Sequence, residues 1–293
     1  MRLGAAYLAF NAQSIDELEP LTEKLDRHGL SAITAPSDLW ERPDDECAAF
    51  GERARELGLV IGEAGFWENM MTDDTERQAE RVQIVRAMLA KADIMGCNCV
   101  VTSVGSKGPA DAWNEPHPYM FTEACKAELR ELVLRLLDGL ELRTTKYCLE
   151  AWCHSFFYSL DEIKDFVEYV DHPNFGVHLD QMNLVTHEYF YRTTELIDRT
   201  FDLLAGYVTS LHMKDIQWDF RHMFLKWDEV LIGDGVLDYD TYLRRIAQDL
   251  PDDVPCYCEH LPSEEAYIEN FQRLHERARE AGLQFKGRSQ VGS

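Results

Sequence analysis

Eight short apolar segments recur along the chain, and each is followed by a stretch with the apolar spacing of an amphipathic helix. Several of the short segments are almost continuously apolar, which is typical of parallel strands buried on both faces. The segments that we interpret as strands are residues 3–10, 31–36, 59–67, 98–105, 146–152, 175–180, 207–213 and 254–261. Because eight strand-helix units in series can close into a ring, the sequence predicts an α/β fold, a (β/α)8 TIM barrel.

The strand-helix alternation continues from one end of the chain to the other, so we expect a single barrel domain over residues 1–285. The full length of 293 residues is within the range of one-domain barrels. The final residues, 286–293, have the composition of a flexible C-terminal tail.

The charge of the chain excludes several classes of partner. Lys and Arg number 29 against 53 Asp and Glu, which gives a net charge of −24. Such a surface repels nucleic acid and anionic membranes, so we expect neither as a partner. No apolar run is long enough to cross a bilayer, and Met1-Arg2 leads directly into the first strand segment without a signal peptide, so a cytoplasmic location is expected.

The eight cysteines include two pairs with one residue between the cysteines, Cys97-x-Cys99 and Cys256-x-Cys258. A spacing of two places both side chains of a pair on the same face of a strand. Buried core thiols are the favoured interpretation of these pairs, with metal ligation as the alternative. We therefore expect reduced cysteines.

Four consecutive strand segments of the second half each carry an ionisable residue late in an apolar run. These residues are Glu150, Asp180, His212 and Glu259. The carboxyl ends of adjacent barrel strands meet at one mouth, so we expect the four side chains to converge there. An isolated buried carboxylate costs roughly several kcal/mol, whereas three carboxylates and an imidazole satisfy one another around a dication.

The alternative is that the four residues have independent structural roles, as a capping Asp, a core His and two Glu paired with basic residues. Their occurrence in successive strands favours a metal site instead. The ligand set is unlike a closed structural zinc site, which prefers Cys and His. We expect one divalent ion, Mn²⁺, with Co²⁺ and Mg²⁺ as alternatives.

Two connections are unusually long, Gly105 to Tyr119 and Lys214 to Leu237, and both follow the carboxyl end of a strand. Long loops at that face of a barrel commonly carry function.

The four residues also carry a resemblance. The sequence resembles the xylose isomerase-like TIM barrel superfamily, the sugar isomerase and epimerase group, over essentially the whole chain. The four match that group's Glu, Asp, His, Glu metal ligands in order and strand position, and Gly233-Asp234-Gly235 resembles its Gly-x-Gly turn. His117-Pro118 resembles a loop of a relative. The resemblance implies a metal-dependent enzyme acting on a small carbohydrate, commonly as a homo-oligomer.

In ketose 3-epimerases of this group, two metal-bound glutamates exchange the proton next to the carbonyl, a role that maps onto Glu150 and Glu259. The sequence departs from those enzymes at Asn183, where they tend to have His, and it lacks their Arg shortly after the metal His, with Arg221 further along. No Gly-rich phosphate cradle is evident. The first hypothesis is therefore a sugar isomerase or epimerase acting on an unphosphorylated sugar.

A lyase is the first alternative. His212-Met213-Lys214-Asp215 resembles inosose dehydratases, and GVHLDQMNL followed by CEHLP resembles catalytic subunits of C-glycoside deglycosidases. That resemblance implies β-elimination from a keto-sugar or 3-keto-glycoside, assisted by Lys214 or His154, and a small β-sheet partner subunit. In the structural alternatives Lys214 pairs with Asp215 or a rim carboxylate, and His154 is a surface residue. A non-catalytic sugar-binding barrel is the second alternative.

The remaining candidates are expected around the substrate. Trp113 and Trp152 are candidates for stacking on a ring, although ordinary packing is the slightly favoured interpretation of aromatic residues near a barrel mouth. His178 lies two residues before Asp180, so it should point to the same side one layer deeper, where it would orient a ligand. The full set of expected substrate contacts is Trp113, His117, Trp152, His178, Asn183 and Arg221.

Overall fold

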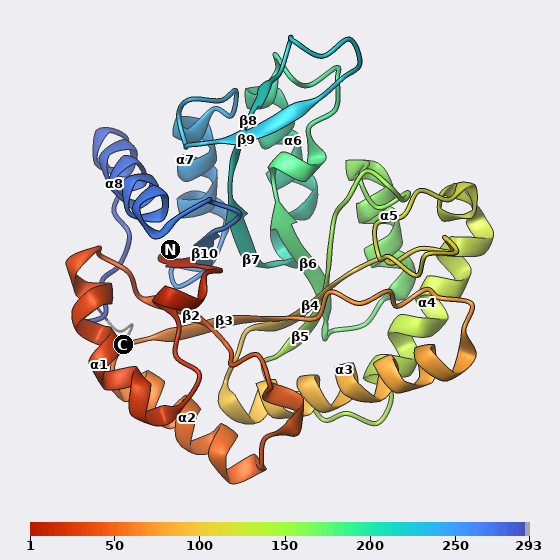
Figure 1. Cartoon of the computed structure of the whole chain (residues 1–293), viewed down its shortest axis with the longest axis horizontal. Helices are drawn as coiled ribbons and strands as arrows, with labels where there is room; N and C mark the ends of the chain where they lie inside the picture. The colour runs from red at the N-terminus through yellow and green to blue at the C-terminus, as the bar shows by residue number, and fades with distance from the viewer. Residues whose placement is uncertain (291–293) are drawn as a thin grey trace.

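A ring of eight parallel strands forms the centre of the protein, as the computed structural model of residues 1–290 shows (Figure 1). The strands of the ring are β1 (Arg2–Ala5), β2 (Ala32–Thr34), β3 (Val60–Gly65), β4 (Cys99–Ser103), β5 (Lys146–Glu150), β6 (Phe175–Asp180), β7 (Val208–Met213) and β10 (Pro255–Cys258). They are hydrogen-bonded in the order β1-β10-β7-β6-β5-β4-β3-β2. The amide of Ser31 donates to the carbonyl of Leu3 at 2.9 Å, which brings the two end strands together and nearly closes the barrel.

The principal helices lie outside this ring. They are α1 (Ile15–Arg27), α2 (Asp44–Glu56), α3 (Thr75–Met95), α4 (Glu123–Leu137), α5 (Leu160–Val170), α6 (Thr193–Leu204), α7 (Tyr239–Asp249) and α8 (Glu264–Glu280). Short 3-10 turns are η1 (Leu8–Phe10), η2 (Leu39–Glu41), η3 (Pro118–Phe121), η4 (Met182–Leu184) and η5 (Ala205–Tyr207). The predicted single-domain TIM barrel is therefore confirmed.

Helix α3 illustrates how local sequence sets the boundaries of these elements. Its N-cap Asp74 accepts hydrogen bonds from the amides of Glu76 and Arg77, which have no partner inside the helix. Its C-cap Gly96 has a φ of 82°, a left-handed conformation that glycine adopts without steric cost. Val85 and Leu89 are fully buried on its inner face. The helix therefore packs one apolar side against the barrel.

The first strand is shorter than predicted. The expected strand at residues 3–10 pairs only over Arg2–Ala5, and Leu8–Phe10 forms the 3-10 turn η1. Its apolar side chains serve separate purposes, because Phe10 is buried against Phe271 whereas Leu8 is 68% exposed. An apolar run alone therefore does not mark where a strand leaves the sheet.

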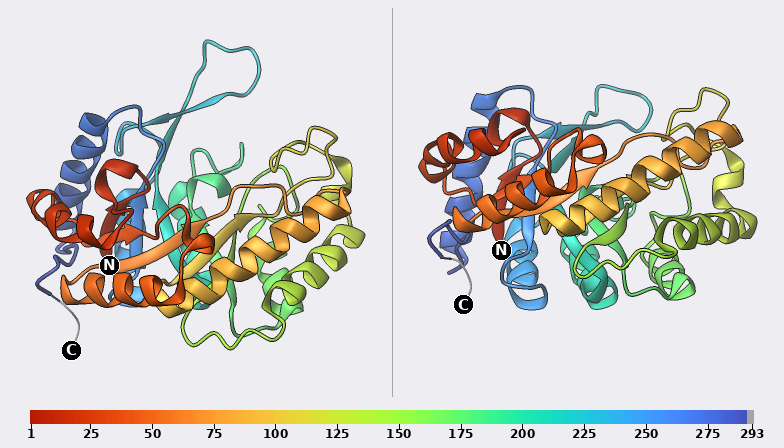
Figure 2. Two further views of the ribbon diagram at one scale, coloured as in Figure 1. Left: turned by 60° about the horizontal axis from the view of Figure 1, so that its bottom comes forward. Right: turned by 90° about the horizontal axis from the view of Figure 1, so that it is seen from below.

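The long connection after β7 also differs from the expected loop. It contains an antiparallel hairpin of β8 (Asp215–Trp218) and β9 (Trp227–Val230), which projects from the barrel (Figure 2). At the base of this hairpin, the Asp215 carboxylate accepts hydrogen bonds from the amides of Gly233, Gly235 and Leu237. The Gly-x-Gly turn predicted from the sequence is thus the segment that Asp215 ties to the end of β7.

The cysteines of the two predicted pairs are buried free thiols. Cys99 lies in the barrel interior, where its Sγ is 3.2 Å from Ser210 Oγ. Residues 286–290, the described part of the expected tail, include Lys286 and Arg288, which hydrogen-bond to Met1 and Asp26 respectively. Within residues 1–290 no helix is both long and apolar enough to span a membrane.

Candidate metal centre

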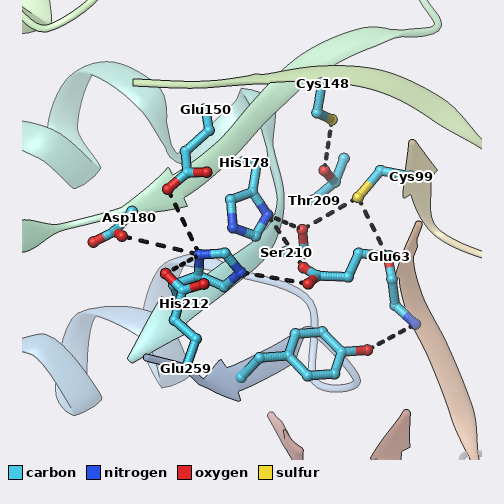
Figure 3. A network of polar contacts seen from close by, with 12 residues as sticks. Glu63, Cys99, Cys148, Glu150, His178, Asp180, Thr209, Ser210, His212 and Glu259 are labelled. Atoms are coloured by element: carbon cyan, nitrogen blue, oxygen red, sulfur yellow. Dashed lines mark hydrogen bonds and ion pairs between the residues drawn. The ribbon is translucent and has the colours of Figure 1, made fainter. Parts of the chain in front are cut away.

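Four ionisable side chains meet at the carboxyl-terminal mouth of the barrel (Figure 3). Glu150 and Asp180 are the last residues of β5 and β6, His212 is next to last in β7, and Glu259 follows β10. All four are buried, and one ligand atom from each lies within 4.8 Å of the others. The parallel register places Asp180 beside His212. The predicted convergence of these four side chains is therefore present in the structure.

The imidazole of His212 is at the middle of the group. Its Nδ1 is 2.7 Å from Glu259 Oε1, 3.6 Å from Glu150 Oε1 and 3.9 Å from Asp180 Oδ2. One nitrogen and three carboxylate oxygens thus face a common point. Such a mixed nitrogen and oxygen donor set suits divalent ions such as Mn²⁺, Co²⁺ and Mg²⁺.

The hydrogen bonding of these atoms provides a test of whether a cation fits. Asp180 Oδ2, His212 Nδ1 and Glu259 Oε1 are buried, and within the described part of the chain none has a hydrogen-bond partner. The short contacts among them lack hydrogen-bond geometry, which leaves lone pairs unsatisfied in a low-dielectric interior. A dication would satisfy these lone pairs, so the residues fit a metal ion.

The local electrostatics are those expected of crowded carboxylates. Burial raises the pKa of Glu150 to about 7, although the neighbouring His212 opposes this rise. Burial would also raise the pKa of Glu259, but the adjacent positive charges of His212 and Lys214 outweigh it and hold that pKa well below its ordinary value. The glutamates therefore differ in their affinity for a proton although both lie at the barrel mouth.

Lys214 supplies positive charge from within the barrel. Its side chain is 3% exposed, and its Nζ is 2.5 Å from Asp180 Oδ2 and 2.7 Å from Glu259 Oε1. Burial alone would lower the pKa of Lys214, but these carboxylates raise it above its ordinary value. The suggested partner Asp215 instead binds the amides of the Gly-x-Gly turn. Lys214 thus pairs with two of the expected metal ligands.

A cavity of about 200 Å³ lies over this group. Its lining consists of Trp67, Trp113, Asn114, Glu150, Trp152, Glu259 and His260. Of the four expected metal ligands, only the two glutamates line it. A larger cavity of about 670 Å³ lies among the amino-terminal ends of the strands, lined by residues such as Val60 and Val208, and so at the opposite end of the barrel from the charged group.

Comparison with known families identifies the fold of the chain more closely. The profile of the xylose isomerase-like TIM barrel family matches residues 22–277. The chain belongs to that family. The resemblance inferred from the four ligands and the Gly-x-Gly turn is therefore confirmed.

Several solved structures share this architecture at low identity. A xylose isomerase-like protein from Mycobacterium smegmatis in complex with magnesium is 17% identical, with 96% of this chain and 97% of that chain covered and a TM-score of 0.68. D-psicose 3-epimerase from Clostridium cellulolyticum H10, with D-tagatose, is 16% identical, with coverages of 97% and 100% and a TM-score of 0.67. A probable 3-DHS dehydratase from Bacillus anthracis is 17% identical, with coverages of 94% and 98% and a TM-score of 0.62.

These structural similarities establish the fold. A search of curated proteins returned no match to the chain.

Within this xylose isomerase-like barrel, several predicted substrate contacts lie near the candidate metal centre. Trp113 and Trp152 line the cavity, with their ring centroids 5.2 Å apart. Asn183 is the middle residue of η4, and its Nδ2 donates a hydrogen bond of 2.8 Å to Glu150 Oε1. His178 is fully buried beneath the centre, and its ring packs edge-on against His212 with centroids 4.0 Å apart.

The other predicted site residues do not line the cavity. His154 is buried, not on the surface, and its Nε2 is 3.3 Å from the carbonyl oxygen of Gly105. His117 caps η3 by accepting a hydrogen bond from the amide of Tyr119. Arg221 lies between β8 and β9, where its Nε is 2.7 Å from Asp219 Oδ1. The structure thus gives each of these three residues a partner away from the four ligands.

Sequence reasoning missed two residues of this barrel mouth and interior. Glu63 is a lone carboxylate in the apolar strand β3, the same signal that pointed to the four expected ligands, and its Oε1 is 3.4 Å from His212 Nε2. His260 lines the cavity with a φ of 56°, and its Nδ1 is 3.0 Å from Glu229 Oε1 on β9. No local sequence pattern predicts the contact between His260 and Glu229, because Glu229 lies in the β8–β9 hairpin, distant in the sequence.

Proposed function

We propose that the protein is a divalent-metal-dependent sugar isomerase or epimerase that removes and returns a proton next to a carbonyl group. One observation carries this proposal. Glu150 and Glu259 belong to the group of four ligands and also line the cavity, whereas Asp180 and His212 belong to the group alone. Two carboxylates therefore reach both a bound cation and a molecule in the cavity, as proton transfer next to a metal-held carbonyl requires.

The proposed division of labour follows from these positions. Glu150, Asp180, His212 and Glu259 would hold the ion, which would polarise substrate oxygens and stabilise the negative charge that develops when the proton leaves. Glu150 or Glu259 accepts that proton, and the other glutamate delivers one. Asn183 orients Glu150 through its hydrogen bond to Oε1. Lys214 offsets part of the negative charge at Asp180 and Glu259.

The lining of the cavity favours a neutral sugar. It combines three tryptophans with Asn114 and His260, and among the described residues it includes no Lys or Arg. Indole rings offer flat apolar faces to a sugar, whereas a phosphate group would call for cationic side chains or a helix N-terminus. We therefore propose an unphosphorylated sugar or keto-sugar as substrate, and Mn²⁺ as the ion with Mg²⁺ or Co²⁺ as alternatives.

A lyase acting on a keto-sugar or 3-keto-glycoside is the second candidate. Lys214 favours it, because a buried ammonium 2.7 Å from Glu259 Oε1 is a potential proton donor to a leaving group. The similarity in fold to the probable 3-DHS dehydratase agrees with this chemistry. Neither Lys214 nor His154 is among the described residues that line the cavity, so we rank the lyase second.

The two candidates can be separated by incubating the metal-loaded protein in D₂O with a panel of free ketoses and 3-keto-glycosides. We expect one substrate to gain deuterium at the carbon next to its carbonyl, with product of inverted or isomerised configuration, as followed by NMR. Elimination of water or an aglycone would select the lyase. No deuterium in any substrate, together with no bound ion, would contradict both candidates and favour a non-catalytic sugar-binding barrel.

Two variants connect that result to the proposed proton-transfer pair. Glu150→Gln and Glu259→Gln retain an oxygen donor but cannot take up a proton, so each should lose exchange by about 100-fold or more while its metal content is checked by elemental analysis. Ser103→Ala is the matched control, since Ser103 ends the neighbouring strand β4 and is equally buried. Exchange retained in both Gln variants would contradict the assignment of the pair.

A cytoplasmic location, a homo-oligomeric state and a small β-sheet partner subunit also remain proposals. The buried free thiols are compatible with a reducing compartment. Size measurement of the purified chain alone and after incubation with cell extract would test the two assembly proposals.

A further inference from the structure

A second polar group lies beneath the four proposed ligands, inside the barrel (Figure 3). It consists of Glu63 from β3, His178 from β6 and Ser210 from β7, and each is buried. Glu63 comes from the opposite half of the sequence and is 149 residues from His212 along the chain. A carboxylate at this depth needs a specific partner, because its desolvation costs roughly several kcal/mol.

The two nitrogens of His212 face different groups. Nδ1 faces the carboxylates of the four-ligand group, with Glu259 Oε1 at 2.7 Å. Nε2 faces Glu63 Oε1 at 3.4 Å, within hydrogen-bond distance. An imidazole that binds a cation through Nδ1 must keep its proton on Nε2, because the lone pair of Nδ1 is then used. That proton is directed at the carboxylate of Glu63.

The neighbours of Glu63 leave His212 as its main partner. His178 Nδ1 is 2.5 Å from Ser210 Oγ but 3.5 Å from Glu63 Oε2, so the hydroxyl is its closer contact. Ser210 also lies 3.2 Å from Cys99 Sγ. Glu63 Oε2 is buried without a hydrogen bond among the described residues. Among the described residues, this carboxylate therefore has one hydrogen bond, the one from His212 Nε2.

We propose that Glu63 is a positioning residue of the metal centre, which accepts the Nε2 proton of His212 and so fixes the tautomer and ring orientation that present Nδ1 to the ion. This inference rests on the proposed metal-dependent function. A carboxylate behind a ligating histidine also makes the imidazole a stronger donor, and loss of such a partner typically weakens metal binding by about 10–100-fold.

A second ion between Glu63, His178 and His212 is the competing interpretation, because these three residues also offer ligand atoms within 4.8 Å of one another. Two ions sharing His212 would require its ring to bind through both nitrogens and to lose both protons. The proposed hydrogen bond needs only the ordinary neutral imidazole. A count of bound ions separates the two interpretations.

The test compares wild type with Glu63→Gln and Glu63→Leu by titration with Co²⁺, whose visible absorption reports the ligand geometry. Glu63→Leu removes the acceptor, whereas Glu63→Gln keeps an oxygen but loses the charge. Cys99→Ala is the matched control, because Cys99 is also buried and contacts Ser210, but among the described residues it forms no hydrogen bond with His212. Circular dichroism of each variant verifies folding, and Glu63→Gln, the nearly isosteric change, provides the test if Glu63→Leu fails to fold.

We expect wild type to bind a single Co²⁺, Glu63→Leu to raise the Kd by about 10–100-fold with a shifted absorption spectrum, and Glu63→Gln to have a smaller effect. Cys99→Ala should match wild type. An unchanged Kd and spectrum in folded Glu63 variants would overturn the positioning role while leaving the metal centre intact. Two ions in wild type, of which Glu63→Leu loses one, would overturn it in favour of a second site. Wild type that binds no ion would instead overturn the proposed function, and this inference with it.

Discussion

The two halves of the barrel use the same architecture for different purposes. Strands β1 to β4 end on Ala5, Thr34, Gly65 and Ser103, whereas Glu150, Asp180, His212 and Glu259 occur at the ends of β5, β6, β7 and β10. The first half demonstrates that closing the sheet requires no charge at these positions. The charges of the second half are therefore costly additions that folding does not explain, and the proposed cation would explain them.

The first half of the barrel provides room for the cavity, and it has one buried charge of its own. Its small strand ends leave room at the mouth, and the loops that follow β3 and β4 place Trp67 and Trp113 on the cavity wall. Glu63 is the exception, because it is a buried carboxylate that faces His212 across the barrel. Variants at matched positions in the two halves can therefore test whether the halves differ in function as they differ in sequence.

The largest difference is expected for loss of a ligand. Asp180→Asn keeps an oxygen for the amide of Met182, which donates to Asp180 Oδ1 at 3.0 Å, but removes the carboxylate charge. We expect metal affinity to fall by more than about 100-fold, beyond the effect of losing a residue behind a ligand. The corresponding strand-end change in the first half, Ser103→Ala, should leave metal affinity unchanged. Elemental analysis and Co²⁺ titration measure the metal affinity of both variants. An equal loss of affinity in the two would show that the two halves of the barrel do not differ in metal binding.

Removal of the buried ammonium should lower the free energy of unfolding of the metal-free protein. Lys214→Met leaves the carboxylates of Asp180 and Glu259 without their cation, and breaking such a buried pair typically costs about 3–5 kcal/mol. We expect the free energy of unfolding of chelator-treated protein to fall by this amount, as measured by denaturant unfolding. Saturating metal should restore part of it. A metal-free variant as stable as wild type would show that Lys214 does not compensate these charges.

Metal binding should stabilise the fold by a smaller amount. At a free concentration of about 100 times the Kd, a ligand that binds only the folded state contributes roughly 2.7 kcal/mol. For a chain of this size that corresponds to a rise in Tm of roughly 4–5 °C, measured by calorimetry with and without chelator. Asp180→Asn should show no such rise, whereas Ser103→Ala should show all of it. A rise that persists in Asp180→Asn would place the ion elsewhere.

The smallest effect is expected for substrate binding at Trp67, which lines the cavity from the first half of the barrel. Trp67 is 42% exposed and its ring centroid is 6.3 Å from that of Trp113. Trp67→Leu should weaken substrate binding by about 0.5–1.5 kcal/mol, a rise in KM of roughly 2–10-fold, because a flat stacking face is lost. Metal affinity should not change. A fall in kcat at constant KM would indicate that Trp67 acts on the reaction step instead of shaping the cavity.

Much of this organisation could be predicted from sequence because it depends on local patterns. Apolar runs at regular intervals predicted eight strands, and polar interruptions late in four of them predicted the converging ligands. Local patterns failed where an apolar run changed its role. The segment ending at Phe10 turns into η1, and the connection after β7 forms the β8–β9 hairpin, because both choices depend on partners from other parts of the chain.

The sequence by itself determined the barrel, because the spacing of apolar residues along each element fixes which face must be buried. It also determined which strand end carries each of the four proposed ligands. Only the tertiary structure decided that Glu63 faces His212 and that Lys214 pairs with Asp180 and Glu259 instead of Asp215. The physical reason is that these contacts form across the barrel interior, where strand pairing and curvature set the distances. The alternation of residues along a single strand carries no information about that register.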